Sequence, residues 1–419
     1  MAFEQNSETG SDPSGTLVSG DVRRHNLSVV ARYLLDQGPA SRSQIAAGTG
    51  LTRGSVTALT TVLLDSGVLA EVAPESTPFQ ASVDARAKGR PLTLLALEAN
   101  HVAILALQLD ADTVTGFLTT LMGKPLLHVV EHHNRPMGQP GLILDRMATV
   151  LGSCLDECRG LGRQLADMTV VVFAPVGGNP GIVVADTDLG WGSVDVIAEL
   201  RLREPRLPDF AQLSADSTLA AQAELGLLPD IQDLVYLKSN SGIGGALISG
   251  GALVTGAHQL AGALGHLPLV PQGEQCACGQ RGCLVTVAGP DEILRAAGLG
   301  KELASDGLTA ALAELIKRIR DGEPRAVAAW EAAVDWISRA LQILTLALDP
   351  QVIVLGGYWA SLADSVAESF ARNRPDLGDG APLPWPDVVA GQLAQDAALM
   401  GAVWQSRDRL LRDPQKIFI

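Results

Sequence analysis

The sequence predicts a small winged helix-turn-helix module at the N-terminus, followed by a larger α/β part that contains a zinc knuckle. Three observations support this fold class. Helical stretches with a short glycine-containing turn fill residues 22–66, strand-like and helix-like stretches alternate from about residue 92, and three of the five cysteines lie within eight residues. A chain of 419 residues is long enough for two or three domains with cores of their own.

The composition is typical of a reduced, cytoplasmic protein. Five cysteines, three of them in one cluster, do not suggest a disulfide scaffold. Residues 1–20 lack an apolar core, so we expect a disordered tail rather than a signal peptide. No apolar run reaches membrane-spanning length, and we expect no membrane association. The net charge of −15 argues against indiscriminate binding of polyanions, but it does not exclude a small DNA-binding module.

The N-terminal module, predicted over residues 21–91, begins with three helices. Apolar residues recur at helical spacing from Leu27 to Leu35, and Gly38-Pro39 ends this first helix. Ser41 is a good N-cap for a short second helix and Thr52 for a third, with a glycine-containing turn at residues 48–51 between them. The expected inner face of the third helix consists of Val56, Leu59, Val62 and Leu63. This order of elements predicts a helix-turn-helix.

The polar face of these helices suits DNA. Short hydroxyl side chains and one arginine lie on the outward positions of the third helix, where Thr60 is also expected, and arginines precede it. Arginine binds phosphates and guanine edges, and Ser or Thr hydroxyls reach either phosphates or bases. The predicted DNA contacts here are Arg23, Arg24, Ser41, Arg42, Thr52, Arg53, Ser55 and Thr57.

A β-hairpin after these helices would form a wing. Residues 67–72 and 91–97 read as its two strands, and the loop between them ends in Lys88, Gly89 and Arg90. A narrow, basic tip can place an arginine in a minor groove, so Lys88 and Arg90 join the predicted DNA contacts. The alternative is a three-helix packing module with a solvated basic loop.

Residues 266–283 contain the ligand set of a zinc knuckle. His266, Cys276, Cys278 and Cys283 supply one imidazole and three thiolates, a complete tetrahedral set for structural Zn²⁺. Glycines next to the cysteines permit the tight bends. Because no coordination position stays open, we expect the metal to be structural. The alternative is a set of buried free cysteines.

The larger part, residues 92–419, alternates strands and helices. Strand-like runs are expected at 102–109, 114–120, 126–130, 168–173, 234–238 and 351–357, and helices at 141–159, 217–226, within 290–348 and at 395–411. Asp188 lies in a polar loop, and Asp216 stands where a strand meets a helix, the place of an active-site carboxylate or of a plain N-cap. The glycine-rich turn at 239–245 could cradle a phosphate or simply turn tightly.

Together these motifs resemble the ROK family of repressors and sugar kinases, and the chain is similar to its transcriptional regulators, such as the xylose and N-acetylglucosamine repressors. The resemblance covers residues 22 to about 411. It is carried by the Ser41–Thr52 helix-turn-helix, Gly89-Arg90-Pro91, Ser241–Gly245, Gly265-His266 and Cys276–Cys283. It implies a two-lobed, actin-like fold of the ribonuclease H and sugar-kinase type, assembled as a homodimer or homotetramer on a palindromic operator.

Departures from the family pattern bear on catalysis. The family kinases carry an Asp-x-Gly-Gly-Thr phosphate loop, whereas the segment taken to match it, Leu97–Ala103, has no glycine pair. Asp216 matches the kinase general base, but a base without a phosphoryl donor does not make a kinase. We therefore expect no kinase activity.

The sugar pocket implied by the resemblance also differs. Two carboxylates and one amide of the family are replaced by Ala263, Val285 and Ala215, while Asp188, Asp216 and His266 remain as candidate effector ligands. A site loses much of its discrimination when such hydrogen-bonding groups vanish. Either another ligand binds or the pocket is vestigial.

The sequence as a whole predicts a DNA-binding transcriptional regulator, a repressor controlled by a sugar or a sugar-derived effector. Two alternatives stay open: an active sugar kinase with a DNA-binding appendage, and a regulator that binds DNA independently of any effector.

Overall fold

The computed structural model describes residues 19–73, 93–133, 135, 137–178, 181–185, 188–259, 261–374 and 384–418. The chain divides into two compact units. The first contains the residues up to His101 together with those from Asp408 onward, and the second contains Val102–Arg407. Lys88 and Arg90, at the tip of the predicted wing, and nearly all of the predicted tail lie outside the described residues.

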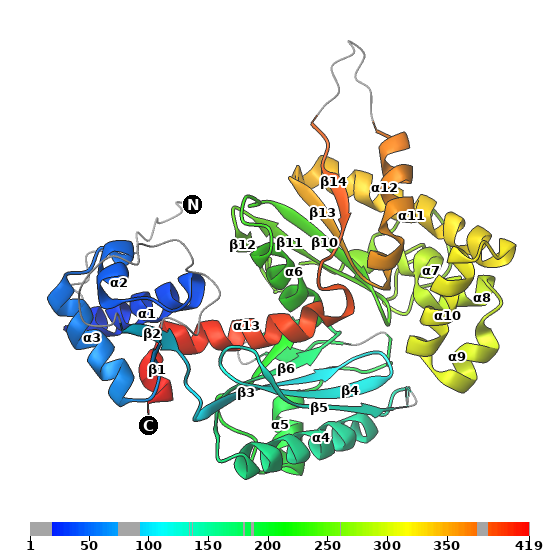
Figure 1. Cartoon of the computed structure of the whole chain (residues 1–419). Helices are drawn as coiled ribbons and strands as arrows, with labels where there is room; N and C mark the ends of the chain where they lie inside the picture. The colour runs from blue at the N-terminus through cyan, green and yellow to red at the C-terminus, as the bar shows by residue number, and fades with distance from the viewer. Residues whose placement is uncertain are drawn as a thin grey trace, which may run out of the picture. The chain divides into compact units, whose positions relative to one another are not determined.

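In the described part of residues 19–101, three helices are followed by a two-stranded sheet, in the predicted order (Figure 1). Its elements are α1 (Ser19–Gln37), α2 (Arg42–Thr49), α3 (Arg53–Asp65), β1 (Leu69–Val72) and β2 (Leu94–Leu97). The two strands are antiparallel, with Leu69 opposite Leu97. Ser41 and Thr52 cap α2 and α3 as predicted, and Gly50 ends α2 in the left-handed conformation with φ of 72°.

The C-terminus of the chain belongs to this first unit. Helix α13 (Ala397–Arg412) begins in the second unit, but its residues from Asp408 onward are grouped with α1. Arg32 of α1 forms an ion pair with Asp408. The ring Nε2 of His101 lies 2.7 Å from the carbonyl oxygen of Ile417, in the short helix η5 (Pro414–Ile417). The sequence predicted helix α13, but it did not predict that the end of α13 contacts the N-terminal helices.

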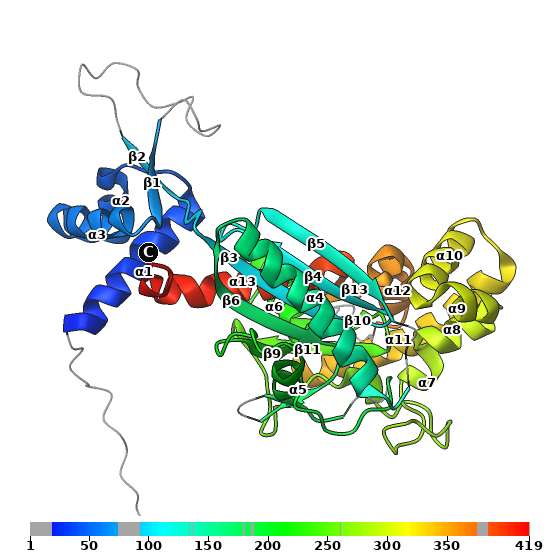
Figure 2. The same ribbon diagram turned by 90° about the horizontal axis from the view of Figure 1, so that it is seen from below.

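The second unit contains two five-stranded sheets of the same topology (Figures 1 and 2). The first has the order β5-β4-β3-β6-β9, in which β5, β4 and β3 are antiparallel and β6 and β9 run parallel to β3. Its strands are β3 (Val102–Leu109), β4 (Thr113–Thr119), β5 (Pro125–His132), β6 (Gln164–Val172) and β9 (Gln212–Ala215). The predicted three-strand meander is therefore present, with boundaries shifted by one or two residues.

The second sheet repeats this pattern in the order β12-β11-β10-β13-β14. Here β12, β11 and β10 are antiparallel, and β13 and β14 run parallel to β10. Its strands are β10 (Leu234–Ser239), β11 (Ile243–Ser249), β12 (Ala252–Leu253), β13 (Val352–Gly357) and β14 (Asp387–Ala390). A further pair, β7 (Val176–Gly177) and β8 (Ile182–Val183), is antiparallel.

Helices cover these sheets and fill the space between them. The first sheet packs on α4 (Pro140–Gly160) and α5 (Val196–Arg203), and α6 (Asp216–Gly226) lies with α13 in an apolar core formed by both sheets (Figure 1). The remaining helices are α7 (Val285–Ala288), α8 (Pro290–Ala296), α9 (Gly300–Asp306), α10 (Leu308–Arg320), α11 (Pro324–Leu348) and α12 (Ala363–Arg372). Among the described residues, none of the helices has the length and apolarity needed to span a bilayer.

Candidate functional site

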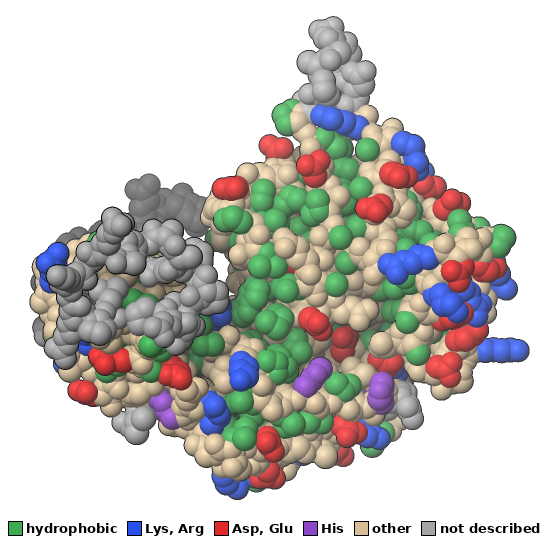
Figure 3. All heavy atoms as spheres, in the orientation of Figure 1, with side chains coloured by type: hydrophobic (Ala, Val, Ile, Leu, Met, Phe, Trp, Pro, Cys, Tyr) green, Lys and Arg blue, Asp and Glu red, His purple; other side chains and the backbone are tan. Residues whose placement is uncertain are grey.

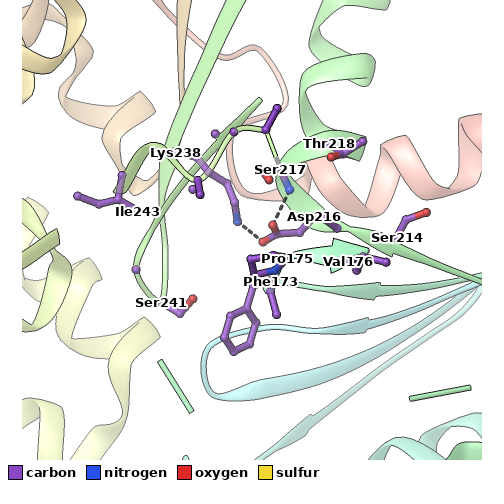
Figure 4. A pocket seen from close by; sticks show the side chains of 18 of the residues that line it. Phe173, Pro175, Val176, Ser214, Asp216, Ser217, Thr218, Lys238, Ser241 and Ile243 are labelled. Carbon is purple, nitrogen blue, oxygen red and sulfur yellow. Dashed lines mark hydrogen bonds and ion pairs between the residues drawn. The ribbon is translucent and has the colours of Figure 1, made fainter. Parts of the chain in front are cut away.

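A cavity of about 270 Å³ opens in the second unit beside the start of α6 (Figure 4). Six parts of the fold line it: the β9–α6 junction, the β10–β11 turn, the segment from β12 to His266, the residues after β6, Asp188 between β8 and α5, and Val285 at the start of α7. Its polar lining side chains are Asp188, Ser214, Asp216, Ser217, Thr218, Lys238, Asn240, Ser241, Thr255, Gln259 and His266. The structure therefore brings all three predicted effector residues, which are far apart in the sequence, to one cavity.

Asp216 does not face this cavity as a free carboxylate. It is 4% exposed, and it forms an ion pair with Lys238, which reaches it from β10 (Figure 4). Its other oxygen accepts a hydrogen bond from the backbone N–H of Ser217. Asp216 is the first residue of α6, with Ala215 at the N-cap position, so its carboxylate is not the plain N-cap that the sequence also allowed.

Lys238 is held in its charged form. Burial disfavours a buried ammonium, but the carboxylates of Asp216 and Asp110 outweigh that penalty and raise the pKa of Lys238. A general base must offer a lone pair to the proton that it removes. In this structure both oxygens of Asp216 already have partners, the Lys238 ammonium and the Ser217 N–H, so neither is free to accept a proton from a sugar hydroxyl.

Lys238 is the main residue that sequence reasoning missed. It ends the run Leu-Val-Tyr-Leu-Lys, in which every residue of β10 is buried. Lysine is rarely fully buried unless it is paired. Lys238 follows four apolar residues in this strand. That pattern in the sequence could have indicated that the lysine is buried and that a carboxylate lies nearby.

Asp188 lies on another wall of the cavity, next to the β10–β11 turn. Desolvation raises its pKa, while Arg135 and a hydrogen bond with Ser241 act in the opposite direction. Ala263 and Val285 also line the cavity, at the positions where the resemblance implies sugar-binding carboxylates. The cavity thus keeps hydrogen-bonding groups on one side and has apolar side chains where the family pattern has acids.

The four predicted metal ligands form one cluster. The ligand atoms of His266, Cys276, Cys278 and Cys283 all lie within 4.8 Å of one another. Two pairs of ligand atoms have the separations expected around one ion: Cys278 Sγ is 3.6 Å from Cys283 Sγ, and Cys276 Sγ is 3.6 Å from His266 Nδ1. Two sulfurs bound to one tetrahedral zinc at about 2.3 Å would be roughly 3.8 Å apart, so the donor set fits that ion.

His266 connects the cluster to the cavity, because it is both a member of the donor set and part of the cavity lining. Burial lowers the pKa of its ring, which favours the neutral imidazole that binds metals. A metal at the cluster would fix the orientation of this ring and of the loop that carries it.

Gly356 and Gly357 end β13, and the protein itself fills the space beside them. A methyl group added at Gly356 would collide with the Tyr236 hydroxyl, and one added at Gly357 would collide with the Asn240 amide. Neither glycine lines the cavity described above. The cavity therefore does not continue along this edge.

The segment Leu97–Ala103 does not form the turn that was compared with the kinase phosphate loop. It runs from the end of β2 into β3, and the first turn between paired strands of the second unit is Asp110–Asp112. This turn also has no glycine. Asp112 accepts hydrogen bonds from the backbone N–H and the hydroxyl of Thr309, at 3.1 and 2.7 Å. The turn therefore lacks the glycine pair of the family's phosphate loop, and its Asp112 carboxylate is engaged by Thr309.

In the first unit, the predicted DNA contacts fall into two groups. Thr52, Arg53 and Thr57 are exposed on α3 and Ser55 is half-exposed, while Arg23 and Arg24 are exposed on α1. The Thr52 hydroxyl accepts a hydrogen bond from Ser55 N at 3.1 Å as the helix cap. All of these side chains reach the surface, although Arg24 also forms an ion pair with Asp21 at 3.2 Å.

The second group is engaged inside the unit. Ser41 is 7% exposed, and its hydroxyl donates to the Gln44 amide oxygen at 2.8 Å within a capping box, so its side chain serves the helix end. Thr60 is fully buried, contrary to the expectation that it points outward, because it lies on the core side of α3 and accepts a hydrogen bond from Arg42 Nε at 3.1 Å. Arg42 itself is partly exposed.

The two-sheet unit with its cavity and Cys₃His cluster defines a protein of the sugar-kinase fold class. The ROK family profile matches residues 115–409. The chain belongs to the ROK family.

Relatives within the family include both regulators and kinases. The chain is 25% identical over 366 residues to the DNA-binding transcriptional dual regulator NagC of Escherichia coli K12, covering 82% of this chain and 84% of NagC. It is 32% identical over 191 residues to the N-acetylmannosamine kinase of Escherichia fergusonii, covering 45% of this chain and 61% of the kinase. The match to the regulator thus extends over much more of the chain.

Solved structures show the same division. A ROK family transcriptional regulator, a homologue of the E. coli Mlc protein, superposes with a TM-score of 0.70 at 21% identity and covers 95% of this chain and 99% of its own. A ROK glucokinase from Streptomyces griseus, in complex with glucose and AMPPNP, gives 0.61 at 22% identity and covers 73% of this chain and 99% of its own. The fold of the second unit is therefore that of the ROK sugar kinases.

Proposed function

We propose that this protein is a DNA-binding transcriptional regulator, a repressor whose operator affinity depends on a sugar or sugar-derived effector, and that it has no kinase activity. The observation that carries the proposal is the Lys238–Asp216 ion pair in the cavity. It blocks the carboxylate that the resemblance assigns as the general base, while the cavity itself remains open to a ligand.

The first unit supports the DNA-binding part of the proposal. Its three helices, the α2–α3 turn and the β1–β2 pair have the order of a winged helix-turn-helix. In such a module the N-terminal residues of the second helix of the motif contact base edges. That position belongs to Thr52, Arg53, Ser55 and Thr57 on α3, while Arg23, Arg24 and Arg42 would hold phosphates, and Lys88 and Arg90 would reach the minor groove.

The charge distribution fits a local DNA site rather than a general one. On the face shown in Figure 3, acidic and basic side chains are interspersed over the larger unit. The net charge of −15 would repel duplex DNA from most of the surface. DNA binding would therefore depend on the few arginines of the first unit and would weaken steeply with salt.

Zinc would be a structural element of the effector site. His266, Cys276, Cys278 and Cys283 would hold the ion, and His266 with Asp188 and Asp216 would contact the effector. The cavity contains polar and apolar walls, which suits a sugar-derived ligand with apolar substituents better than an unmodified hexose. Loss of the metal should loosen His266 and with it the effector response.

A continuous set of elements could transmit the effect of a ligand. Asp216 in the cavity begins α6, and Gly401 of α13 lies so close to the Leu219 carbonyl of α6 that a side chain there would collide with it. Helix α13 then continues to Asp408, which pairs with Arg32 of α1. A ligand that shifts α6 would therefore move α13. Because Asp408 of α13 is paired with Arg32, this movement would reach α1.

The DNA-binding proposal is tested with the full chain and the Arg53→Ala variant. A labelled library of short genomic duplexes is titrated by fluorescence anisotropy at low and moderate salt. We expect the wild type to select a subset of duplexes and the variant to lose most of that selection. Equal binding of all duplexes by both proteins would overturn the proposal.

A second candidate function, an active sugar kinase, is favoured by the similarity to N-acetylmannosamine kinase and by the retained Asp216. A coupled assay of ADP release over a panel of hexoses and N-acetylated amino sugars separates the two. The regulator proposal expects no turnover above that of the Asp216→Asn variant. Sugar-dependent turnover that Asp216→Asn abolishes would establish the kinase instead.

A further inference from the structure

The turn Asp110–Asp112 joins β3 to β4, but it packs among helices that belong to the second sheet (Figure 1). Ala111 is 4% exposed and shares an apolar core with Leu308 and Leu312 of α10. Among the described residues, Ala111 is the only buried member of this core that precedes Val235. The first lobe, which is the first sheet with α4 and α5, therefore inserts this turn into the second lobe, which is the second sheet with α7–α12.

The carboxylate of Asp112 caps α10 from the other lobe. It is 5% exposed, and its two oxygens accept hydrogen bonds from the backbone N–H of Thr309 at 3.1 Å and from the Thr309 hydroxyl at 2.7 Å. Thr309 lies in the first turn of α10, where backbone N–H groups have no partner within the helix and a negative charge is stabilising. The residue at the N-cap position is Gly307, which offers no side chain, and a methyl group there would come within 2.8 Å of the Asp112 carboxylate. Asp112 thus supplies the cap that α10 lacks.

His133, which follows β5 and is 3% exposed, links this turn to a second contact. Its backbone N–H donates to the Asp112 carbonyl at 2.8 Å, and its ring Nε2 lies 3.0 Å from the Asp110 carbonyl oxygen. Burial lowers the pKa of the ring, which favours the neutral form. A neutral ring that donates from Nε2 has a free lone pair on Nδ1, and Nδ1 accepts the backbone N–H of Arg135 at 3.3 Å. One imidazole therefore holds both the turn and Arg135.

Arg135 forms the second contact between the lobes. Its guanidinium donates two hydrogen bonds to the Asp291 carboxylate of α8, at 3.2 and 3.4 Å. The backbone of Arg135 has φ of 45°, a conformation that costs energy in a residue other than glycine and persists where its surroundings enforce it. Arg135 and Asp291 both act electrostatically on Asp188, so the pair lies beside the wall of the cavity.

We propose that these contacts form a lobe lock, in which Ala111, Asp112 and Arg135 of the first lobe fasten it to α8 and α10 and keep the cavity closed before any ligand binds. The lock combines apolar packing, a helix cap and an ion pair, all between the same two lobes. A ligand then enters and leaves only while the lock is open, which slows both steps. Lobe closure cannot report the ligand, because the lobes are closed already. The inference goes beyond the proposed function and does not rest on it.

Hydrogen–deuterium exchange of the full chain, with no ligand added, tests the lock. The wild type should exchange slowly at the cavity segments 188–191 and 239–245. Asp112→Ala should speed exchange there by about tenfold, the effect of losing a hydrogen bond to a charged group on the population of open molecules. Arg135→Ala should speed it by about two- to fivefold, because its ion pair is partly exposed.

The matched control is Arg146→Ala, since Arg146 pairs with Glu131 at 3.9 Å within the first lobe. This variant should leave exchange at the cavity segments unchanged. Exchange in β6 and β13, inside the two sheets, should also stay at the wild-type rate in every variant, which separates opening of the lobes from unfolding. Arg135→Asp should open the lock, and adding Asp291→Arg should close it again.

Three results would overturn the proposal. The first is a wild type that exchanges at the cavity segments as fast as Asp112→Ala. The second is faster exchange that is confined to α8 and α10, as expected of a cap and a surface pair with local effects only. The third is an equal rise in β6 and β13. None of these measurements involves DNA or an effector, so they are distinguishable from a failure of the proposed function.

Discussion

Replacing Lys238 by methionine should destabilise the second unit strongly. Methionine has a similar length and no charge, so the change leaves the Asp216 carboxylate, 4% exposed, without its ammonium. Removing one partner of a buried ion pair costs about 3–5 kcal/mol. At about 2 °C per kcal/mol for a large domain, the midpoint of thermal unfolding should fall by about 6–10 °C.

The loss should depend on pH. Burial raises the pKa of Asp216 even with Lys238 present, and removing the ammonium raises it further. A carboxyl whose pKa is raised in the folded state stabilises the fold while protonated, below its unfolded pKa, and this stabilisation is lost as pH rises through the folded pKa. Relative to wild type, Lys238→Met should therefore be least destabilised in mild acid and most destabilised above neutral pH.

Thermal unfolding followed by circular dichroism at a series of pH values checks both statements. The control is the double variant Lys238→Met with Asp216→Asn, which removes the charge but keeps an acceptor for the Ser217 N–H. It should recover most of the lost stability and lack the added pH dependence of Lys238→Met, because Asn does not titrate. A loss below about 1 kcal/mol, typical of a surface pair, or equal losses in the single and double variants, would refute the account of this pair.

Three further predictions concern the other parts of the chain. Ser41→Ala should lower the stability of the first unit by about 1 kcal/mol through loss of the helix cap, yet leave the DNA affinity of the folded protein unchanged. Arg53→Ala should weaken DNA binding and leave the stability unchanged. Melting and fluorescence anisotropy measured on both variants check this, and the reverse pattern would contradict the assignment of Ser41 as a cap and Arg53 as a DNA contact. The purified protein should contain one zinc ion per chain by elemental analysis. Cys278→Ala should lose the zinc together with any ligand-induced change in operator affinity. If this variant keeps the ligand-induced change, the metal does not contribute to the effector response. Arg32→Asp should diminish the change in DNA affinity that an effector causes, and adding Asp408→Arg should restore that change. If the effector changes DNA affinity equally in wild type and both variants, the Arg32–Asp408 contact does not transmit the effector signal.

The sequence predicted those features that depend on local chemistry. Helix caps at Ser41 and Thr52, and four metal ligands of which three lie within eight residues, follow from short stretches of chain. The structure adds contacts between residues far apart in sequence. The pairing of Lys238 with Asp216 joins strand β10 to the first residue of α6, 22 positions apart, and that of Arg32 with Asp408 joins residues 376 apart.

Two expectations failed. Thr60 was placed outward because its side chain is polar, although its position on α3 turns it to the core, where Arg42 satisfies its hydroxyl. The phosphate-loop comparison was made at Leu97–Ala103, because the sequence does not show which of two neighbouring stretches forms the first turn of the sheet. Helical periodicity places Thr60 on the buried face of α3 with Val56, Leu59 and Leu63, so residue type alone misled there. The first turn of the sheet, in contrast, depends on the pairing of distant strands.

The most direct test of the central claim is a selection of duplex DNA from a random pool by the wild-type chain. Its control is a variant that carries both Arg53→Glu and Thr57→Glu on the exposed face of α3. The account predicts that the wild type enriches one palindromic sequence and that the variant enriches none. A wild-type chain that enriches no sequence beyond this variant would contradict it.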